Sequence, residues 1–163
     1  MPPIPKSKQL GRYSKQAKKS KVTNYMEKLP KKIKEATAWQ KFSKSVRMGA
    51  ITLVVGNEGL GECYTCGKTI PVKEGDAGHC ISRRIKSTKY NRQNVKLQCK
   101  KCNKWLNGNT VNFIKNMGID MYSQLLELSM RSFKIDQVFL NEINEESKFI
   151  IDKISKEKGV AKW

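Results

Sequence analysis

The spacing of apolar residues predicts an amphipathic helix in the first third of the chain. From Met26 onward, apolar side chains recur every three or four residues, which places them on one face of an α-helix. They are Met26, Leu29, Ile33, Ala36, Trp39, Phe42 and Val46. The other face is largely lysine, as expected of a helix with one buried side. Pro30 has no amide hydrogen to donate, so this helix is expected to be interrupted or to begin there.

Further helices are expected after residue 109. Residues 110–117 have a short helical pattern, which Gly118 ends. Asp120 is expected to cap the next helix. The last helix has one apolar stripe, and most of its charged residues lie on other faces. The stripe consists of Phe139, Ile143, Ile150 and Ile154. Packing onto the helix's own domain and formation of a dimer explain this stripe equally well.

Short strands are expected between these two helical regions. The β-branched run 51–55 ends in the turn sequence Gly56-Asn57-Glu58-Gly59, which can close a strand or lead into the next unit. Three further strand-like pieces are separated by basic loops and span Lys68–Val72, Asp76–Ile81 and Asn94–Cys99. We therefore predict an α+β fold in which α-helices flank a small core of strands.

The charge distribution indicates a polyanionic partner. The 163 residues suit one compact domain with extensions and carry a net charge of +19. Residues 1–118 have a net charge of +20, whereas residues 119–163 have a net charge of −1. Such an excess attracts nucleic-acid phosphates through counterion release, although an anionic membrane surface or plain solubility would also explain it. Residues 1–22 hold seven basic and no acidic residues, so we expect a disordered basic arm there.

The cytosol is the expected location. No apolar run approaches the roughly 18 to 20 residues of a membrane span, and the N-terminus lacks the apolar segment of a signal peptide. Thiols in the cytosol stay reduced, so the five cysteines are expected to bind metal rather than to form disulfides.

Four of the cysteines have the spacing of a zinc site. Cys63 and Cys66, like Cys99 and Cys102, are separated by two residues, and thiolates at this spacing can share one tetrahedral Zn²⁺. Such a closed site has a structural role, because no position is left for water. A redox-active pair is the competing interpretation, which the presence of a second matched pair disfavours. Cys80 is expected to be a buried thiol in a strand, without a metal.

The 32 residues between the two pairs exceed the roughly 15 to 20 of a plain zinc ribbon, which indicates an insertion. This insertion contains the only histidine of the chain, His79, and a basic stretch follows it. Within that stretch, Arg83, Arg84, Lys86 and Lys89 are candidates for DNA binding through phosphate contacts, and a solvated surface is the alternative explanation.

Several motifs occur in a fixed order along the middle of the chain. They are Cys63-Tyr64-Thr65-Cys66-Gly67-Lys68, Asp76-Ala77-Gly78-His79, Asn94-Val95, Gln98-Cys99, Cys102-Asn103 and Leu106-Asn107-Gly108-Asn109. In combination they resemble the phage NinG/Rap recombination endonuclease family, and they are also similar to phage endonuclease VII. The resemblance covers roughly residues 62–118. It implies a zinc-stabilised ββα-metal (HNH-like) core and an endonuclease for branched DNA such as Holliday junctions.

The resemblance also implies roles for individual residues. His79 would be the general base, since a neutral imidazole can take a proton from water at physiological pH. Asp76 and Asn103 would bind a catalytic Mg²⁺, which Mn²⁺ can replace, because hard oxygen ligands suit that ion. The products would carry 5′-phosphate and 3′-hydroxyl ends. Asn94 would brace the loop that carries the histidine, and Asn109 would be a cap or a group behind the ligands. A homodimer is expected, because symmetric cutting of a junction needs two active centres.

One residue departs from the common ββα-metal pattern. That pattern has an aspartate directly before the histidine, where this chain has Gly78, and the nearest acid is Asp76. Two other functions therefore stay open: a non-catalytic zinc protein that binds nucleic acid, and a nicking or homing-type nuclease that acts on linear duplex. The expected organisation has four parts. These are a basic arm (1–22), a helix and strand (23–61), the nuclease core (62–118) and C-terminal helices (119–163).

Overall fold

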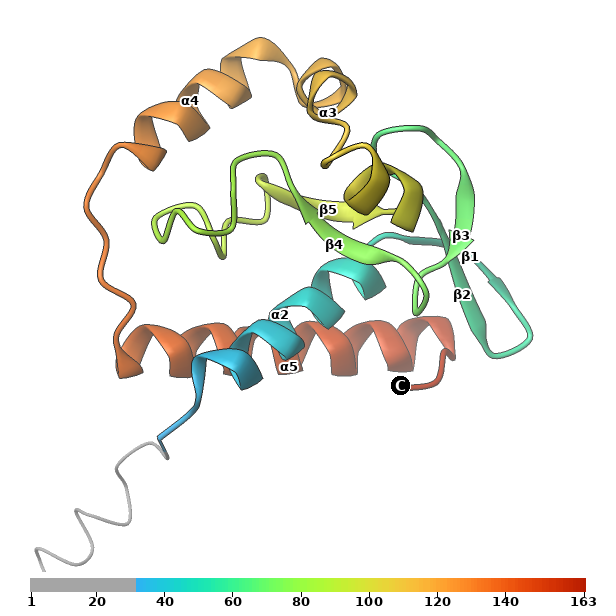
Figure 1. Ribbon diagram of the computed structural model, residues 1–163. Helices are drawn as coiled ribbons and strands as arrows, with labels where there is room; N and C mark the ends of the chain where they lie inside the picture. The colour runs from blue at the N-terminus through green and yellow to red at the C-terminus, as the bar shows by residue number, and fades with distance from the viewer. Residues whose placement is uncertain (1–31) are drawn as a thin grey trace, which may run out of the picture. The chain divides into compact units, whose positions relative to one another are not determined.

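The computed structural model describes residues 32–163, which form one unit (Figure 1). The predicted basic arm, residues 1–22, and the beginning of the predicted N-terminal helix lie outside the described residues. Helices and strands are both present, so the predicted α+β class is confirmed. Within residues 32–163, no helix combines the length and the apolar character needed to cross a lipid bilayer.

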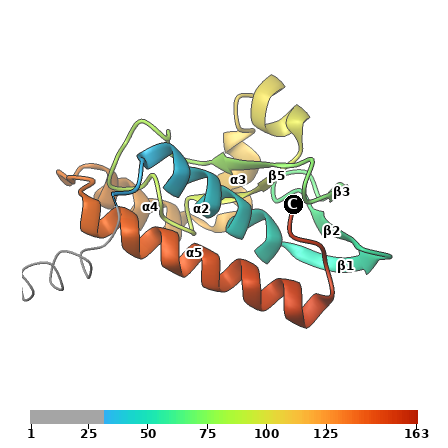
Figure 2. The same ribbon diagram turned by 90° about the horizontal axis from the view of Figure 1, so that it is seen from below.

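Two helices lie side by side beneath the strands (Figures 1 and 2). Helix α2 spans Glu35–Gly49 and helix α5 spans Gln137–Lys158. The carboxylate of Asp136 caps α5 by accepting a hydrogen bond of 2.9 Å from the amide of Phe139. Buried side chains of both helices meet those of the strands in two clusters, which form the core. The clusters contain Ala38, Phe42, Tyr90, Val95, Leu140 and Ile143, and Met48, Ile51, Val72, Leu97, Ile151 and Val160.

The buried stripe of α5 differs from the predicted one. Leu140, Ile143 and Ile151 are buried, whereas Ile150 and Ile154 are only partly buried. Phe139 and Ile154 of the predicted stripe still pack against the core clusters, so the stripe is confirmed in part. The buried face also includes Ser147, a polar residue that interrupts the apolar pattern. The stripe packs within the chain, because its residues belong to the two core clusters.

Within residues 32–163, five short strands form two antiparallel sheets. Strands β1 (Ile51–Val55), β2 (Glu58–Glu62) and β3 (Thr69–Pro71) pair in that order. Strand β4 (Asp76–His79) pairs with β5 (Val95–Gln98), and all strands except β2 lie within predicted strand segments. Strand β2 was not predicted, because its two glycines disfavour a strand. A glycine is needed at position 61, since a Cβ there would lie 2.4 Å from the carbonyl oxygen of Ala50.

The register of the β4–β5 hairpin decides which side chains face each other. Asp76 pairs with Gln98, and His79 pairs with Val95. Successive side chains of a strand point to opposite faces of its sheet. His79 and Val95 therefore share the face that packs on α2, and Asp76 and Gln98 share the opposite face.

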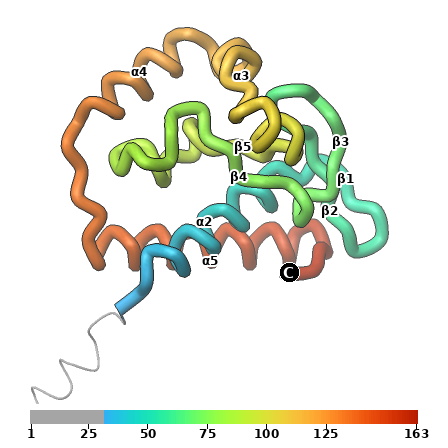
Figure 3. The backbone as a smooth tube through the Cα atoms, in the orientation of Figure 1, coloured from blue at the N-terminus to red at the C-terminus, as the bar shows by residue number. Residues whose placement is uncertain are grey.

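Between β5 and α5 the chain runs through further helical segments. They are the π-helical turn η1 (Lys101–Trp105), helix α3 (Thr110–Met117) and helix α4 (Ile119–Ser129). The tube in Figure 3 follows the chain through α3 and α4. Helix α3 has the predicted bounds, but η1 was not predicted, because its basic residues show no apolar periodicity. The prediction that Asp120 caps α4 is wrong. Gly118 both ends α3 and occupies the cap position of α4, so Asp120 lies inside the first turn.

Candidate metal cluster and the His79 cleft

Four cysteine side chains meet beside the β4–β5 hairpin. Cys63 and Cys66 lie between β2 and β3, Cys99 directly follows β5, and Cys102 lies in η1. Their sulfur atoms all lie within 4.8 Å of one another, so together they can hold one metal ion. Cys80 is not part of this cysteine cluster. The prediction of a buried thiol in a strand is wrong for Cys80, which is only partly buried because β4 ends one residue before it.

Amide groups donate hydrogen bonds to the sulfur atoms of the cysteine cluster. The backbone amide of Cys99 donates to Sγ of Cys63 over 3.3 Å, and that of Cys102 donates to Sγ of Cys99 over 3.4 Å. The side-chain amide of Asn109 donates to Sγ of Cys102 over 3.5 Å. Asn109 lies at the N-cap position of α3, but its side chain contacts a sulfur and does not cap the helix. Donors of this kind stabilise thiolates.

The thiols of the cysteine cluster differ in acidity. Burial alone would raise the pKa of Cys63, but hydrogen bonds from the Thr65 hydroxyl and from three backbone amides lower it to about 6. Burial raises the pKa of Cys66 to about 12, and the neighbouring Cys63 adds to this rise. One thiolate therefore opposes ionisation of the others. A divalent cation would remove this opposition, because its charge keeps every coordinating thiol deprotonated.

The imidazole of His79 is held in one orientation at the end of β4. Its ring stacks on the indole of Trp39 from α2, with ring centroids 5.1 Å apart and 27° between the planes. Its Nε2 lies 3.0 Å from the carbonyl oxygen of Lys89. Because a carbonyl oxygen can only accept, Nε2 carries the hydrogen of the neutral ring, and Nδ1 keeps a lone pair.

The surroundings of His79 keep its ring neutral. Burial lowers the pKa of His79, the hydrogen bond to the Lys89 carbonyl opposes this in part, and the charges of Arg83 and Lys89 lower it further, to about 4. Near pH 7 the ring is therefore uncharged, and Nδ1 is able to accept a proton.

Asn94 connects the loop after β4 to β5. Its side-chain amide donates to the carbonyl oxygens of Ile81 and Thr88 over 2.9 and 3.0 Å. Its side-chain oxygen accepts a hydrogen bond of 2.7 Å from the amide of Ile81. Asn94 is fully buried, so these three bonds satisfy its polar atoms and fix both ends of the segment from Ile81 to Thr88.

The His79 ring borders a cleft of 360 Å³, which we call the His79 cleft. Its lining residues come from α2, β4, the loop after β4 and the η1 region. They are Trp39, Ala77, His79, Arg83, Asn103, Asn107 and Gly108. Of the two predicted Mg²⁺ ligands, Asn103 lines the cleft and Asp76 does not. The two are joined by a hydrogen bond of 3.0 Å from Nδ2 of Asn103 to Oδ2 of Asp76.

The residues predicted to bind DNA have different surroundings. Arg83, Arg84 and Lys86 are exposed on the loop after β4, and the guanidinium of Arg83 lies 5.4 Å from the centre of the Trp39 ring. The ammonium group of Lys89 forms an ion pair with Glu35, and its side chain is only 17% exposed. A phosphate contact by Lys89 would therefore require it to leave this ion pair.

Comparison of the sequence with known protein families identifies the family of this chain. A family model described as the bacteriophage lambda NinG protein matches residues 4–158, nearly the whole chain. The chain belongs to the NinG family. This family is associated with phage recombination, so that part of the predicted resemblance is confirmed. No curated protein and no solved structure matches the chain.

Gly78 of this NinG chain has a neighbour that leaves no space for a side chain. A Cβ at Gly78 would lie 1.8 Å from the side-chain oxygen of Gln98. An aspartate directly before His79, as in the common ββα-metal pattern, therefore does not fit while Gln98 keeps this position.

Two residues of this NinG site could not be recognised from their sequence positions. Trp39 belongs to the apolar stripe of α2 and was expected in the core, yet it stacks on His79, forty positions away. Gln98 was noted only as part of a motif. The one available signal was the place of Gln98 at the end of a short strand whose Val95 and Leu97 are apolar. Gln98 is buried there, and a buried glutamine needs partners for its amide.

Proposed function

We propose that this protein is a zinc-stabilised, metal-dependent endonuclease of the ββα-metal class that cuts branched DNA, such as Holliday junctions, in phage recombination. The observation that carries this proposal is the neutral His79 ring, which is tied to the Lys89 carbonyl and borders a cleft together with Arg83 and Asn103. The order of the elements supports the class, because a hairpin that carries the histidine is followed by a helical turn that carries the asparagine.

His79 acts as the general base in this proposal. Its Nδ1 takes a proton from water, the water oxygen forms a bond to the phosphorus, and the bond between the phosphorus and the 3′-oxygen breaks. The departing 3′-oxygen takes a proton from solvent water. The products carry 5′-phosphate and 3′-hydroxyl ends. The pKa of about 4 applies to the protein without DNA. The negative charge of a bound phosphate favours the imidazolium and raises this pKa, which makes His79 a stronger base when substrate is present.

Zn²⁺ is the ion proposed for the cysteine cluster. Four cysteine ligands leave no open coordination position, which is typical of a structural zinc site. The cluster connects the turn after β2 to the end of β5 and to η1. Filling it would therefore fix η1, and with it Asn103, relative to the hairpin that carries His79.

Mg²⁺, which Mn²⁺ can replace, is the ion proposed for the His79 cleft. Asp76 and Asn103 are the proposed ligands, because their hydrogen bond holds a carboxylate beside a side-chain amide, and the oxygens of both groups are ligand types that suit this ion. The bound ion would supply positive charge that neutralises the phosphate and the departing oxygen. Burial lowers the pKa of Arg47, and the nearby carboxylate of Asp76 opposes this in part. The positive charge of Arg47 would compete with a bound cation for the Asp76 carboxylate, so Asn103 is the more available ligand.

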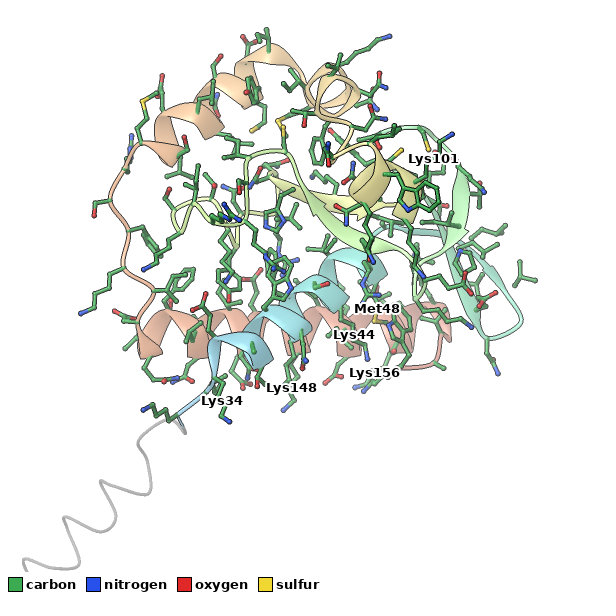
Figure 4. The ribbon with its side chains drawn as sticks, viewed as in Figure 1. Lys34, Lys44, Met48, Lys101, Lys148 and Lys156 are labelled. Carbon is green, nitrogen blue, oxygen red and sulfur yellow. The ribbon has the colours of Figure 1, made fainter. Side chains whose placement is uncertain are left out.

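DNA binding and dimer formation complete the proposal. Arg83, Arg84 and Lys86 would contact phosphates and position the DNA without reading its bases. Figure 4 shows lysines on two sides of the described unit, Lys101 on η1 and Lys148 on α5, so basic charge is not confined to the cleft. A homodimer would supply the two active centres that symmetric cutting of a junction needs.

A non-catalytic zinc protein that binds nucleic acid is the second candidate. The observation that favours it is the pKa of His79, because a base works best when its pKa is near the operating pH and about 4 is far below that range. Phosphate binding must raise this value for the nuclease proposal to hold.

Cleavage of different DNA shapes separates these functions. Wild type and His79→Ala are incubated with a four-way junction, a flap and a linear duplex, with Mg²⁺ or with a chelator. We expect Mg²⁺-dependent cleavage of the junction and a loss of about 10²-fold or more in His79→Ala, with unchanged junction affinity. Arg92→Lys serves as the matched control for a change near the loop that leaves His79 intact. Binding without cleavage by the wild type would favour the accessory protein, and preferred cleavage of linear duplex would favour a homing-type nuclease.

A further inference from the structure

Gln98 has a buried oxygen without a partner. Its side chain is 0% exposed, and its Nε2 donates to the carbonyl oxygen of Gly108 over 2.7 Å and to the hydroxyl of Thr65 over 3.2 Å. Its Oε1 accepts no hydrogen bond from any of residues 32–163. Buried polar atoms nearly always have a partner, so this oxygen indicates that something is bound beside it.

The orientation of the Gln98 amide is fixed by its neighbours. Exchanging the nitrogen and the oxygen would place Oε1 against the carbonyl oxygen of Gly108, and two acceptors at that distance repel each other. The nitrogen must therefore face Gly108, and the oxygen must face Gly78.

A second amide oxygen approaches the same place. A Cβ built on Gly78 would lie 1.8 Å from Oε1 of Gln98 and 3.0 Å from Oδ1 of Asn103. The two oxygens are therefore no farther apart than the sum of these distances. Nδ2 of Asn103 donates to Asp76, so its Oδ1 is directed away from that carboxylate and is free to face Gln98.

The chemistry of this convergence selects a hard cation. Two amide oxygens that face each other without a donor between them repel, and a positive charge beside both removes the repulsion. Neutral amide oxygens are ligands of Mg²⁺, Mn²⁺ and Ca²⁺, and opposite ligands of one Mg²⁺ stand about 4.2 Å apart, given bonds of about 2.1 Å. The upper limit on the separation of the two oxygens is close to this span.

We infer that Oε1 of Gln98 is a ligand of the divalent cation, beside Asn103, and that position 78 is a glycine so that this oxygen can approach. Gln98 then occupies the space that a side chain at position 78 would need. The inference rests on the cation site of the proposed function, but not on DNA cleavage.

Direct binding of Mn²⁺ to the full-length, zinc-loaded protein tests this inference without DNA. Electron paramagnetic resonance follows the signal of free Mn²⁺ as protein is added. We expect Gln98→Met, which keeps the length of the side chain and removes its oxygen, to weaken Mn²⁺ binding at least tenfold. Gln93→Met is the matched control, because Gln93 is exposed and its oxygen accepts only from Lys96, so its Mn²⁺ affinity should equal that of the wild type.

A second variant covers the case in which Gln98→Met does not fold. Gly78→Ala keeps Gln98 but places a methyl group where it would force Oε1 away, so the same tenfold loss is expected. Zinc content and thermal unfolding of each variant show whether it is folded. Wild-type affinity for Mn²⁺ in the folded variants, or no Mn²⁺ binding by the wild type, would overturn the inference. A buried water would then be the partner of Oε1.

The same variants separate this inference from the proposed function. Mn²⁺ binding that depends on Gln98 in a protein that never cuts DNA would support the inference and refute the nuclease. Cation-dependent cleavage that is unchanged in Gln98→Met, together with unchanged Mn²⁺ binding, would do the opposite.

Discussion

The cysteine cluster and the His79 cleft lie next to each other but are built in different ways. The cluster takes two ligands from each of two short segments, and the two residues between paired cysteines already bring their sulfurs close together. The cleft takes its residues from α2, β4, the loop after β4 and the η1 region. The cluster offers four soft thiol groups that can surround one ion, whereas the cleft offers nitrogen and oxygen groups beside the apolar Trp39 and Ala77. The difference teaches that the first site can be assembled from local spacing and would stabilise the fold once it holds a metal ion, whereas the second site depends on the fold being complete.

Loss of a cysteine ligand should have the largest effect, because it removes the metal ion that is proposed to stabilise the fold. Metal binding contributes about 10 kcal/mol or more to the apparent folding free energy of small zinc modules. We therefore expect Cys102→Ser to lose its metal and its cooperative thermal transition, measured by metal analysis and circular dichroism. Cys80→Ser is the matched control, since Cys80 lies outside the cluster and should keep both properties. A Cys102→Ser protein with full metal content would contradict the proposed zinc site.

Asn94→Ala should destabilise the loop after β4 without changing metal binding by the cysteine cluster. The substitution leaves two carbonyl groups and one amide of the loop without their partner, at a cost of about 4 kcal/mol for three buried groups. Urea unfolding should show this loss while the metal content stays unchanged. Asn112→Ala is the control, because the exposed Asn112 bonds only to Asn109, and its effect should stay below about 0.5 kcal/mol. Loss of metal from Asn94→Ala would show that cluster and loop are one unit.

The pH dependence of stability should reveal the neutral His79. The folded pKa of about 4 is below the ordinary value of 6.5, so the unfolded chain binds a proton between these values and the folded chain does not. The free energy of unfolding should therefore fall by about 3 kcal/mol as the pH drops from 6.5 to 4, and His79 should add no further loss below pH 4. Protonation of the cysteines contributes in the same range, so the measured quantity is the difference between wild type and His79→Gln in urea unfolding. Equal pH dependence of the two proteins would refute a buried neutral histidine.

Arg83→Ala should have the smallest effect of the four. Loss of one phosphate contact should weaken junction binding by about 1 kcal/mol and reduce the slope of log Kd against log salt by about one. Titration of a labelled junction at several salt concentrations measures both quantities. Lys148→Ala on α5 is the control, because Lys148 is exposed and does not line the cleft. If both variants weaken junction binding equally, binding depends on the total positive charge of the protein, and the DNA does not contact the cleft.

The same contrast explains what could be predicted from the sequence. The α+β class, four of the five strands in the described part of the chain and the grouping of the cysteines follow from local patterns, namely apolar periodicity and the spacing of paired cysteines. Local patterns failed where a tertiary contact overrides them. Strand β2 contains glycines because Ala50 lies against Gly61, and η1 has no apolar periodicity, although it carries Cys102 and Asn103.

The cleft could be predicted only in part. His79 was noted as the only histidine in the insertion between the cysteine pairs, and the role of Asn103 came from the family resemblance; both residues line the cleft. The stacking of Trp39 on His79 depends on how α2 packs against β4, and the approach of Gln98 to Gly78 depends on the register of the hairpin. No spacing within one segment contains this information, because each contact joins residues that are 20 or more positions apart.

Chemical rescue tests the central claim, that the His79 imidazole removes the proton from the attacking water. The single-turnover rate of junction cleavage is measured for His79→Ala with and without added imidazole, at saturating protein and Mg²⁺. We predict that His79→Ala is slower than the wild type by about 10²-fold or more, and that imidazole restores part of the rate because it can occupy the space beside Trp39. Cleavage by His79→Ala at the wild-type rate without imidazole would contradict the account.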